Sequence, residues 1–254
     1  MQKTLGMLLL LLITGYVAAC IVLFLAQRSF IYFPPPSAAV PAPRTSTLAV
    51  PGAEIRISER PLQGSKAVIY LGGNAEDVSA SLPLLDSAFP GRALYLMHYR
   101  GYAGSTGKPT EEALVADALA LFDRVRTEHS DIVVIGRSLG TGVAVRMATL
   151  RPVSKLVLVT PYDSLGELAA RQFRFFPVRL LLTDKYESGK YAPRVKVPTL
   201  ILAAEHDEII PARSTELLFS RFANGVASMK VIEGAGHNSI SDSASYISSL
   251  QWAR

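Results

Sequence analysis

Six short and almost uninterrupted apolar runs recur along the chain after residue 66. They are AVIYL (67–71), ALYLM (93–97), IVVIG (132–136), KLVLVT (155–160), TLILAA (199–204) and MKVIEG (229–234). Near-continuous apolarity is typical of parallel strands that are covered on both faces of a sheet. The preceding stretch STLAVPGAEIRIS (46–58) alternates between apolar and polar positions instead, so it predicts an antiparallel hairpin at the edge of the sheet.

Helical patterns separate these runs. The clearest is TEEALVADALALFDRV, in which Thr110 can cap the first turn and the early glutamates suit the helix dipole. Others cover 139–150, 212–222 and 239–250. Strands that alternate with helices predict a doubly wound α/β sheet. The segment 164–196 breaks this alternation, since it is long, aromatic, basic and interrupted by Pro177, and we expect it to form a small helical cap.

The N-terminal region has a different pattern. Leu5 to Ala26 contains no charge, and 22 residues in a helix span ~33 Å, enough to cross a bilayer core. We therefore predict a single-pass membrane anchor over 1–28, a proline-rich linker over 29–45 and the α/β domain over 46–254. A cleaved signal peptide and lipidation at Cys20 are alternatives, and the nearly balanced flanking charges leave the side of the membrane open.

Composition limits the partners of the chain. The net charge is +5 over 254 residues, and the stretch 167–196 alone carries seven basic and three acidic residues. Because no basic stripe runs through the rest of the chain, nucleic acid is not expected as a partner, whereas anionic lipid headgroups suit an anchored basic patch. The one cysteine lies in the apolar stretch, which excludes a disulfide framework and a cysteine metal site. The oligomeric state is left open.

Candidate catalytic residues follow the predicted strands. In an open α/β sheet, ligands bind at the carboxyl ends of the strands. Ser138, Asp207 and His237 each follow a different apolar run, and this chain order of serine, acid and histidine is that of α/β-hydrolases. Ser138 lies in a G-x-S-x-G pattern between Gly136 and Gly140, which predicts a nucleophile on a sharp strand-to-helix turn. A structural serine in a tight turn is the alternative.

The candidate base and acid that would act with Ser138 are identified by the loops in which they lie. His237 lies between glycines after the last run and can reach the serine as a general base. Asp207 is the expected acid that orients this histidine, and Asp163 is the second candidate. Of the other histidines, we expect His98 to be packed and His129 to be solvated.

An oxyanion hole needs two backbone N–H donors. Leu139, directly after the serine, and Asn74, in the loop GGN after the first run, are the expected donors. A plain glycine turn is the alternative interpretation of this loop.

With these residues in place, the sequence resembles the α/β-hydrolase superfamily. Within it, the chain is similar to the Bem46-like group of membrane-anchored serine hydrolases, which includes the α/β-hydrolase domain containing proteins of types 12, 13 and 17. The resemblance rests on QRSFIYFP, GGNAED, YRGYAGSTGKPTE, IGRSLGTGVA, TPYDSL, VPTLILAAEHDEIIP and GAGHN. It implies hydrolysis of esters or thioesters of acyl, lipid-like substrates without a cofactor or metal. Two positions depart from the group's pattern, since Gly72 replaces a histidine and His98 replaces an aspartate.

The sequence thus predicts a membrane-anchored serine esterase, thioesterase or lipase. Five aromatic residues are candidates for its substrate pocket: Tyr99, Tyr162, Phe173, Phe175 and Phe176. Arg171, Arg174 and Arg179 are candidates for contacts with headgroups. The alternative interpretation of the cap residues is structural: the aromatic residues form part of the core, and the arginines form a solvated basic face above it. A non-catalytic membrane scaffold of the same fold, a serine peptidase and a perhydrolase remain alternative functions.

Overall fold

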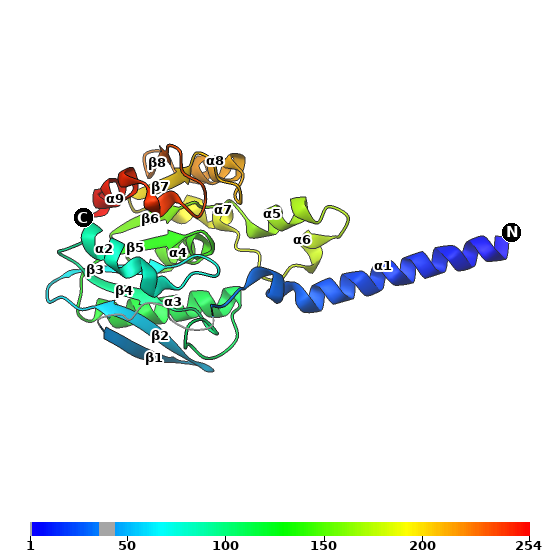
Figure 1. The fold of residues 1–254 in the computed structure, drawn as a ribbon, viewed down its shortest axis with the longest axis horizontal. Helices are drawn as coiled ribbons and strands as arrows, with labels where there is room; N and C mark the ends of the chain where they lie inside the picture. Colours follow the sequence, from blue (N-terminus) through cyan, green and yellow to red (C-terminus); the bar gives the residue numbers. More distant parts are fainter. Residues whose placement is uncertain (1, 36–43) are drawn as a thin grey trace.

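The chain folds around a single eight-stranded sheet. A computed structural model describes residues 2–35 and 44–254. The strands are β1 Arg44–Val50, β2 Ala53–Arg60, β3 Lys66–Leu71, β4 Ala93–Met97, β5 Asp131–Arg137, β6 Lys155–Val159, β7 Thr199–Ala204 and β8 Ala227–Ile232. Their order in the sheet is β1-β2-β4-β3-β5-β6-β7-β8 (Figure 1). All six predicted runs form strands, which confirms the α/β class.

The direction of pairing divides the sheet in two. From β4 across to β8 every neighbouring pair is parallel, while β2 is antiparallel to both β1 and β4. The predicted edge hairpin is therefore correct. The last strand lies two residues earlier than predicted, because its pairing with β7 runs from Ala227 beside Thr199 to Ile232 beside Ala204. Glu233 and Gly234 form the turn that follows.

Helices cover both faces of the sheet. Apolar side chains of α3 (Glu111–Arg126), α4 (Leu139–Leu150) and α8 (Ala212–Arg221) pack on one face. Those of α2 (Leu82–Ala88) and α9 (Ala244–Leu250) pack on the other. Thr110 caps α3, since its side chain accepts a hydrogen bond from the Ala113 amide, as predicted. The short 3-10 helix η1 (Val78–Ser81) and α2 were not predicted, and the expected helix 239–250 is divided into η3 (Ile240–Asp242) and α9.

The segment after β6 forms the small helical cap that the sequence predicts. It contains α5 (Leu165–Gln172), α6 (Val178–Leu181), α7 (Ser188–Tyr191) and the 3-10 helix η2 (Ala192–Arg194). Pro177 lies between α5 and α6 and is the N-cap residue of α6, five residues after α5 ends at Gln172. In Figure 1, α5 and α6 lie beside the end of α1 that is nearer the domain.

Helix α1 (Gln2–Ile31) is uncharged over most of its length and extends away from the sheet (Figure 1). By length and composition it could cross a membrane. It continues three residues past the predicted end of the anchor at 28. The greater part of the predicted proline-rich spacer falls outside the described residues, and β1 begins at Arg44, two residues before the predicted start of the domain.

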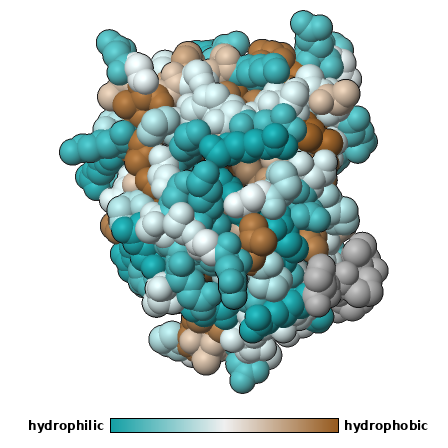
Figure 2. Space-filling view, turned by 90° about the vertical axis from the view of Figure 1, so that its left-hand side faces the viewer, coloured by the Kyte–Doolittle hydropathy of each residue, from teal (hydrophilic) through white to brown (hydrophobic). Residues whose placement is uncertain are grey.

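The side of the domain that faces away from α1 has a different character. Figure 2 shows it as mostly hydrophilic, with hydrophobic side chains scattered singly among polar ones. Single exposed apolar residues are ordinary on a globular surface. This side therefore gives no reason to expect an apolar partner.

Candidate active site

Ser138 lies on a strained turn between β5 and α4. Its backbone has φ +46° and ψ −115°, a combination that residues other than glycine rarely adopt. The turn needs glycine at both flanking positions of the motif. A Cβ on Gly136 would lie 2.5 Å from the Gly140 carbonyl oxygen, and a Cβ on Gly140 would overlap the Leu71 carbonyl oxygen of β3. The predicted spacing thus has a direct steric cause. The turn lifts the serine hydroxyl off the end of the sheet.

Ser138, His237 and Asp207 form a continuous hydrogen-bonded chain. His237 Nε2 lies 2.9 Å from Ser138 Oγ, and His237 Nδ1 lies 2.9 Å from Asp207 Oδ2. Because a carboxylate can only accept, Nδ1 carries the proton and Nε2 is free to accept from the serine hydroxyl. The histidine and aspartate side chains are only 4% and 7% exposed, so water competes little for these bonds. The sequence prediction placed these three residues on three different loops, and the fold brings them together.

Asp207 is fixed from two sides. Its Oδ1 accepts hydrogen bonds from the amides of Ile209 (3.0 Å) and Ile210 (2.7 Å). Glu208 Oε2 accepts from the His237 amide at 3.0 Å, and Glu205 Oε2 accepts from the Gly234 amide at 2.8 Å. Hydrogen bonds from the backbone amides of His237 and of Glu208 itself hold the pKa of the Glu208 carboxyl below its ordinary value. Both glutamates therefore tie the loop of Asp207 to the loop of His237.

The loop after β3 approaches the candidate nucleophile Ser138 closely. A Cβ on Gly73 would lie 3.6 Å from Ser138 Cβ. The Asn74 amide donates to no acceptor among the described residues, and Leu139, the first residue of α4, has no acceptor within its own helix. Both predicted oxyanion donors are therefore uncommitted beside the serine. The Asn74 side chain accepts from the Phe33 amide (3.0 Å) and the Tyr102 hydroxyl (2.8 Å), which links this loop to the segment after α1.

Glu76 is a residue of the site that sequence reasoning missed. Its carboxylate accepts from the Gly73 amide (2.6 Å), the Tyr70 hydroxyl (2.7 Å) and the Ser81 hydroxyl (2.7 Å). Arg137 Nη1 lies 3.7 Å away, and the Nη2 atom of the same arginine donates to the Asn238 carbonyl at 3.3 Å. Glu76 and Arg137 thus connect the loops that hold the candidate oxyanion donor, the serine and the histidine. No spacing rule in the sequence indicated this network.

The two departures from the family pattern are accommodated locally. A Cβ on Gly72 would overlap Val78 Cγ1, so a larger residue at this position requires the Val78 side chain to move. His98 is buried, as expected, and its Nε2 lies 2.8 Å from Ser58 Oγ; burial lowers the pKa of its imidazole to about 4. The residues that follow are well anchored, since Tyr99 donates to the Gly72 carbonyl at 2.8 Å and Arg100 forms two 2.7 Å hydrogen bonds with Asp117.

The remaining polar candidates lie outside the triad. Asp163, the second candidate acid, pairs with Arg221 at 2.6 Å. His206 is exposed and faces Glu205. His129 was expected to be solvated, and this prediction is wrong: the residue is buried, with its ring nitrogens 3.0 Å from the Tyr95 hydroxyl and 2.7 Å from the Gly64 carbonyl. Among the described residues, no group of three or more histidine, cysteine or carboxylate side chains could hold a metal ion.

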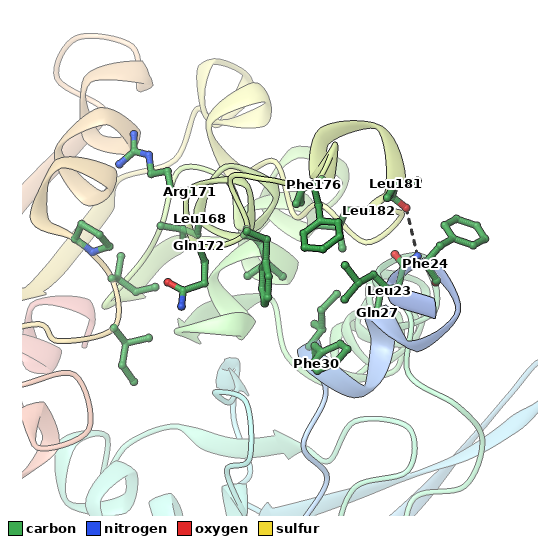
Figure 3. Close-up of a pocket in the computed structure, with 18 residues that line it drawn as sticks. Leu23, Phe24, Gln27, Phe30, Leu168, Arg171, Gln172, Phe176, Leu181 and Leu182 are labelled. Carbon is green, nitrogen blue, oxygen red and sulfur yellow. Dashed lines mark hydrogen bonds between the residues drawn. The ribbon is translucent and has the colours of Figure 1, made fainter. Parts of the chain in front are cut away.

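An apolar pocket of about 460 Å³ lies between α1, the cap and the loop after Asp207. Figure 3 shows Leu23, Gln27 and Phe30 of α1 on one side, and Leu168, Gln172 and Phe176 across from them. Of the predicted pocket residues, Phe173 and Phe176 line this space.

The other three predicted pocket residues do not line this space. Tyr99 and Tyr162 are fully buried in the core, where Tyr162 donates to the Leu139 carbonyl at 3.3 Å. Phe175 is 75% exposed and does not line this space. Tyr99 and Tyr162 instead donate hydrogen bonds to the carbonyls of Gly72 and Leu139, and so stabilise the loop after β3 and the start of α4. The periodicity of the sequence could not separate these buried rings from pocket-lining ones.

Comparison with known proteins identifies the family. A family model described as alpha/beta hydrolase matches residues 71–192. An uncharacterized protein of Mycobacterium tuberculosis is 34% identical over 246 residues, with 89% of this chain and 86% of that protein covered. The chain belongs to the α/β-hydrolase family. This result confirms the resemblance inferred from its motifs.

Two further matches are informative. The lysophosphatidylserine lipase ABHD12 of Macaca fascicularis is 30% identical over 187 residues, which cover 64% of this chain and 47% of the lipase. The solved structure of a Pyrococcus furiosus esterase superposes with a TM-score of 0.72 at 18% identity, over 87% of this chain and 97% of that one. At this identity the second similarity concerns the fold alone.

Proposed function

We propose that this α/β-hydrolase is a membrane-anchored serine hydrolase that cleaves the carboxylic ester or thioester bond of acyl, lipid-like substrates. The observation that carries the proposal is the hydrogen-bonded chain from Ser138 Oγ through His237 to Asp207. It joins a nucleophile, a base and an orienting acid in the arrangement that acyl transfer requires.

In the first half-reaction, Ser138 Oγ attacks the acyl carbonyl carbon while His237 Nε2 takes the hydroxyl proton. The negative charge that develops on the carbonyl oxygen is stabilised by the N–H groups of Asn74 and Leu139. Collapse of this tetrahedral intermediate breaks the bond to the leaving alcohol or thiol, which takes the proton back from His237. The product that remains is an acyl ester of Ser138.

In the second half-reaction, water attacks the acyl-enzyme carbonyl and gives its proton to His237. The carboxylic acid leaves, and the proton returns to Ser138 Oγ. Asp207 stays ionised throughout and stabilises the imidazolium form of His237. The amides of Ile209 and Ile210 keep its carboxylate in place while the charge on the histidine changes.

Three observations support a lipid-like substrate and a membrane location. Helix α1 has the length and apolarity of a membrane span. A relative that is 30% identical carries the name lysophosphatidylserine lipase. An apolar pocket beside the acid loop suits an acyl chain better than a peptide, whose backbone would need polar partners.

Labelling with a fluorophosphonate probe tests the proposal. The probe phosphonylates an activated serine, so the full-length wild type in detergent should be labelled and Ser138→Ala should not. Ser164→Ala is the matched control, since that hydroxyl caps α5 outside the triad, and it should be labelled like the wild type. Absence of Ser138-dependent labelling in folded protein would contradict a serine hydrolase and favour a non-catalytic scaffold.

A further inference from the structure

The pocket beside the candidate triad is built partly from the helix expected to lie in the membrane. Five of its lining residues belong to the last third of α1: Leu23, Phe24, Gln27, Phe30 and Ile31. The opposite wall comes from the cap, and the third side is Ile209, Ile210 and Pro211. A helix that served only as a membrane tether would not need to form part of a pocket in the α/β domain.

Specific contacts hold α1 against the cap. The Gln27 side chain donates to the Leu181 carbonyl at 3.3 Å and accepts from the Thr183 amide (2.7 Å) and hydroxyl (2.8 Å). Arg28 pairs with Asp184 at 3.2 Å. Further up the helix, the Tyr16 ring stacks on Phe176 with a centroid distance of 5.8 Å. The wall formed by α1 is therefore fixed relative to the cap along several turns.

The length of α1 sets the depth of the cap in a bilayer. The part of the uncharged stretch that lies before Tyr16, Leu5–Gly15, spans ~17 Å, whereas a bilayer core is about 30 Å thick. The remaining ~13 Å of the core must then surround the stretch of α1 that the cap contacts. In a bilayer, the cap beside this stretch therefore reaches into the apolar core.

The tip of the cap has the surface that such immersion needs. Phe175 is 75% exposed and Leu180 is 82% exposed, on the part of the cap that lies beside α1. Such exposure of large apolar side chains on one small element is unfavourable in water but favourable in a leaflet. Arg174, whose guanidinium lies 5.0 Å from the Phe175 ring centroid, can extend to the headgroups in the manner of interfacial arginines.

Residues in and next to the pocket wall hydrogen-bond to residues of the proposed chemistry. Ile209 and Ile210 contribute to its wall and donate their amides to Asp207. On the side of α1, Phe33 follows the pocket residue Ile31 by two positions and donates its amide to Asn74. The pocket thus lies between the segment that holds the acid and the segment that holds the candidate oxyanion loop. Its volume of about 460 Å³ accommodates ~15 methylene groups, if each takes roughly the ~30 Å³ of a water molecule.

We propose that α1 is one wall of the substrate site, and that the groove between α1 and the cap receives a single long acyl chain of a bilayer lipid directly from the leaflet. The proposal rests on the proposed function and deepens it, because it makes a membrane-embedded long-chain acyl ester the substrate. Only the scissile carbonyl then leaves the headgroup region to reach Ser138, and the chain stays in apolar surroundings throughout.

A pair of tryptophan variants on one helix tests the groove. Leu23→Trp fills it from the wall formed by α1, whereas Leu25→Trp adds the same bulk at a position that is 76% exposed and does not line it. We expect Leu23→Trp to lower, at least tenfold, the ratio of kcat/KM for a palmitoyl ester in phosphatidylcholine vesicles to kcat/KM for a soluble butyrate ester. Leu25→Trp should leave the ratio unchanged. Leu168→Trp, on the cap wall, repeats the test from the other side and should match Leu23→Trp. Equal ratios in all three variants would overturn the proposal.

A binding measurement separates the groove from the chemistry. Full-length Ser138→Ala in phosphatidylcholine vesicles is exposed to a trace of a lysophospholipid whose C16 chain carries a diazirine. We expect photocrosslinks within 168–182 and 23–31 that Leu23→Trp abolishes and Leu25→Trp retains. If no Ser138-dependent hydrolysis is found but these crosslinks form, the proposed function fails and the groove stands. Crosslinks spread evenly along α1 and insensitive to Leu23→Trp would contradict the groove itself.

Discussion

The carboxyl edge of the sheet and the side of the molecule formed by the cap and α1 are built on opposite principles. At the sheet edge, polar side chains are buried and every bond of the Ser138–His237–Asp207 chain is supported by further hydrogen bonds. On the cap side, large apolar side chains such as Phe175 and Leu180 are exposed, and a few polar contacts join α1 to α6 and the loop after it.

This difference shows that the proposed acyl transfer and the proposed recognition of the acyl chain place different requirements on the structure. Acyl transfer needs donors and acceptors held within a few tenths of an ångström, which only a close-packed sheet provides. Recognition of an acyl chain needs apolar area and little directionality, so in our proposal a cap completed by α1 and lipid is sufficient. The predictions below test this division, from the largest expected effect to the smallest.

The largest effect is expected at Asp207. Asp207→Asn keeps an oxygen for the amides of Ile209 and Ile210 but no longer fixes the proton on His237 Nδ1, so kcat for a soluble ester should fall by ~10⁴. Asp163→Asn is the matched control, because that acid pairs with Arg221 instead. If Asp163→Asn caused the larger loss, the assignment of the acid would be wrong. Steady-state kinetics and a circular dichroism spectrum of each variant suffice.

A steric prediction concerns the turn that carries the candidate nucleophile Ser138. Gly140→Ala places a Cβ against the carbonyl oxygens of Leu71 and Gly72, which are backbone atoms and cannot move aside cheaply. We expect a loss of ~3 kcal/mol in unfolding free energy, at the upper end of the usual cost of overpacking. Gly91→Ala, with no atom within 4 Å of the added Cβ, should change stability by less than ~0.5 kcal/mol. Similar denaturant midpoints for the two variants would refute the close approach of α4 to β3.

His98 should make the sheet side sensitive to acid. Its pKa is about 4 in the fold against an ordinary value near 6.5, so the unfolded chain binds more protons between these pH values and stability falls as pH decreases. The loss between pH 7 and pH 5 should be ~2 kcal/mol. His98→Gln retains a donor toward Ser58 without an ionisable group and should remove this dependence. Urea unfolding at pH 7 and pH 5 measures this change in unfolding free energy. The same change in His98→Gln as in the wild type would show that another group titrates.

The smallest effect is expected at the contact between α1 and the cap. Gln27→Ala removes three hydrogen bonds to Leu181 and Thr183 and should weaken the docking of the cap by ~1 kcal/mol. Faster amide hydrogen exchange in 178–184, with unchanged exchange in β5, is the expected readout. Arg179→Ala, which breaks an exposed pair with Glu167, is the control and should alter exchange little. Equal exchange in both variants would mean that α1 does not order the cap.

Much of the fold and of the candidate site could be predicted from the chain alone. Buried parallel strands require continuous apolar runs, and each of the six runs is a strand. The elbow motif is read directly because Gly136 and Gly140 meet backbone atoms that no side chain could avoid. The order of Ser138, Asp207 and His237 follows from strand order, since each residue ends up at the same edge of the sheet.

The supporting network and the pocket could not be predicted, because they depend on residues that are far apart in sequence. Glu76 and Glu208 look like ordinary solvated glutamates until the loops fold back and present amide donors to them. Tyr99, Tyr162 and Phe175 share the aromatic character of Phe173 and Phe176, and only packing decides which rings line a cavity. Sequence periodicity reports burial along one element and contains nothing about which other element covers it.

By itself, then, the sequence determined the sheet, the elbow, the candidate triad and an apolar helix long enough for a membrane, since these depend on local pattern and strand order. Only the tertiary structure decided that α1 turns one face to the cap and closes a pocket beside the acid loop. The physical reason is that a uniformly apolar helix carries no signal that distinguishes a face toward protein from a face toward lipid. That distinction arises only when Gln27 and Arg28 meet their partners in the cap.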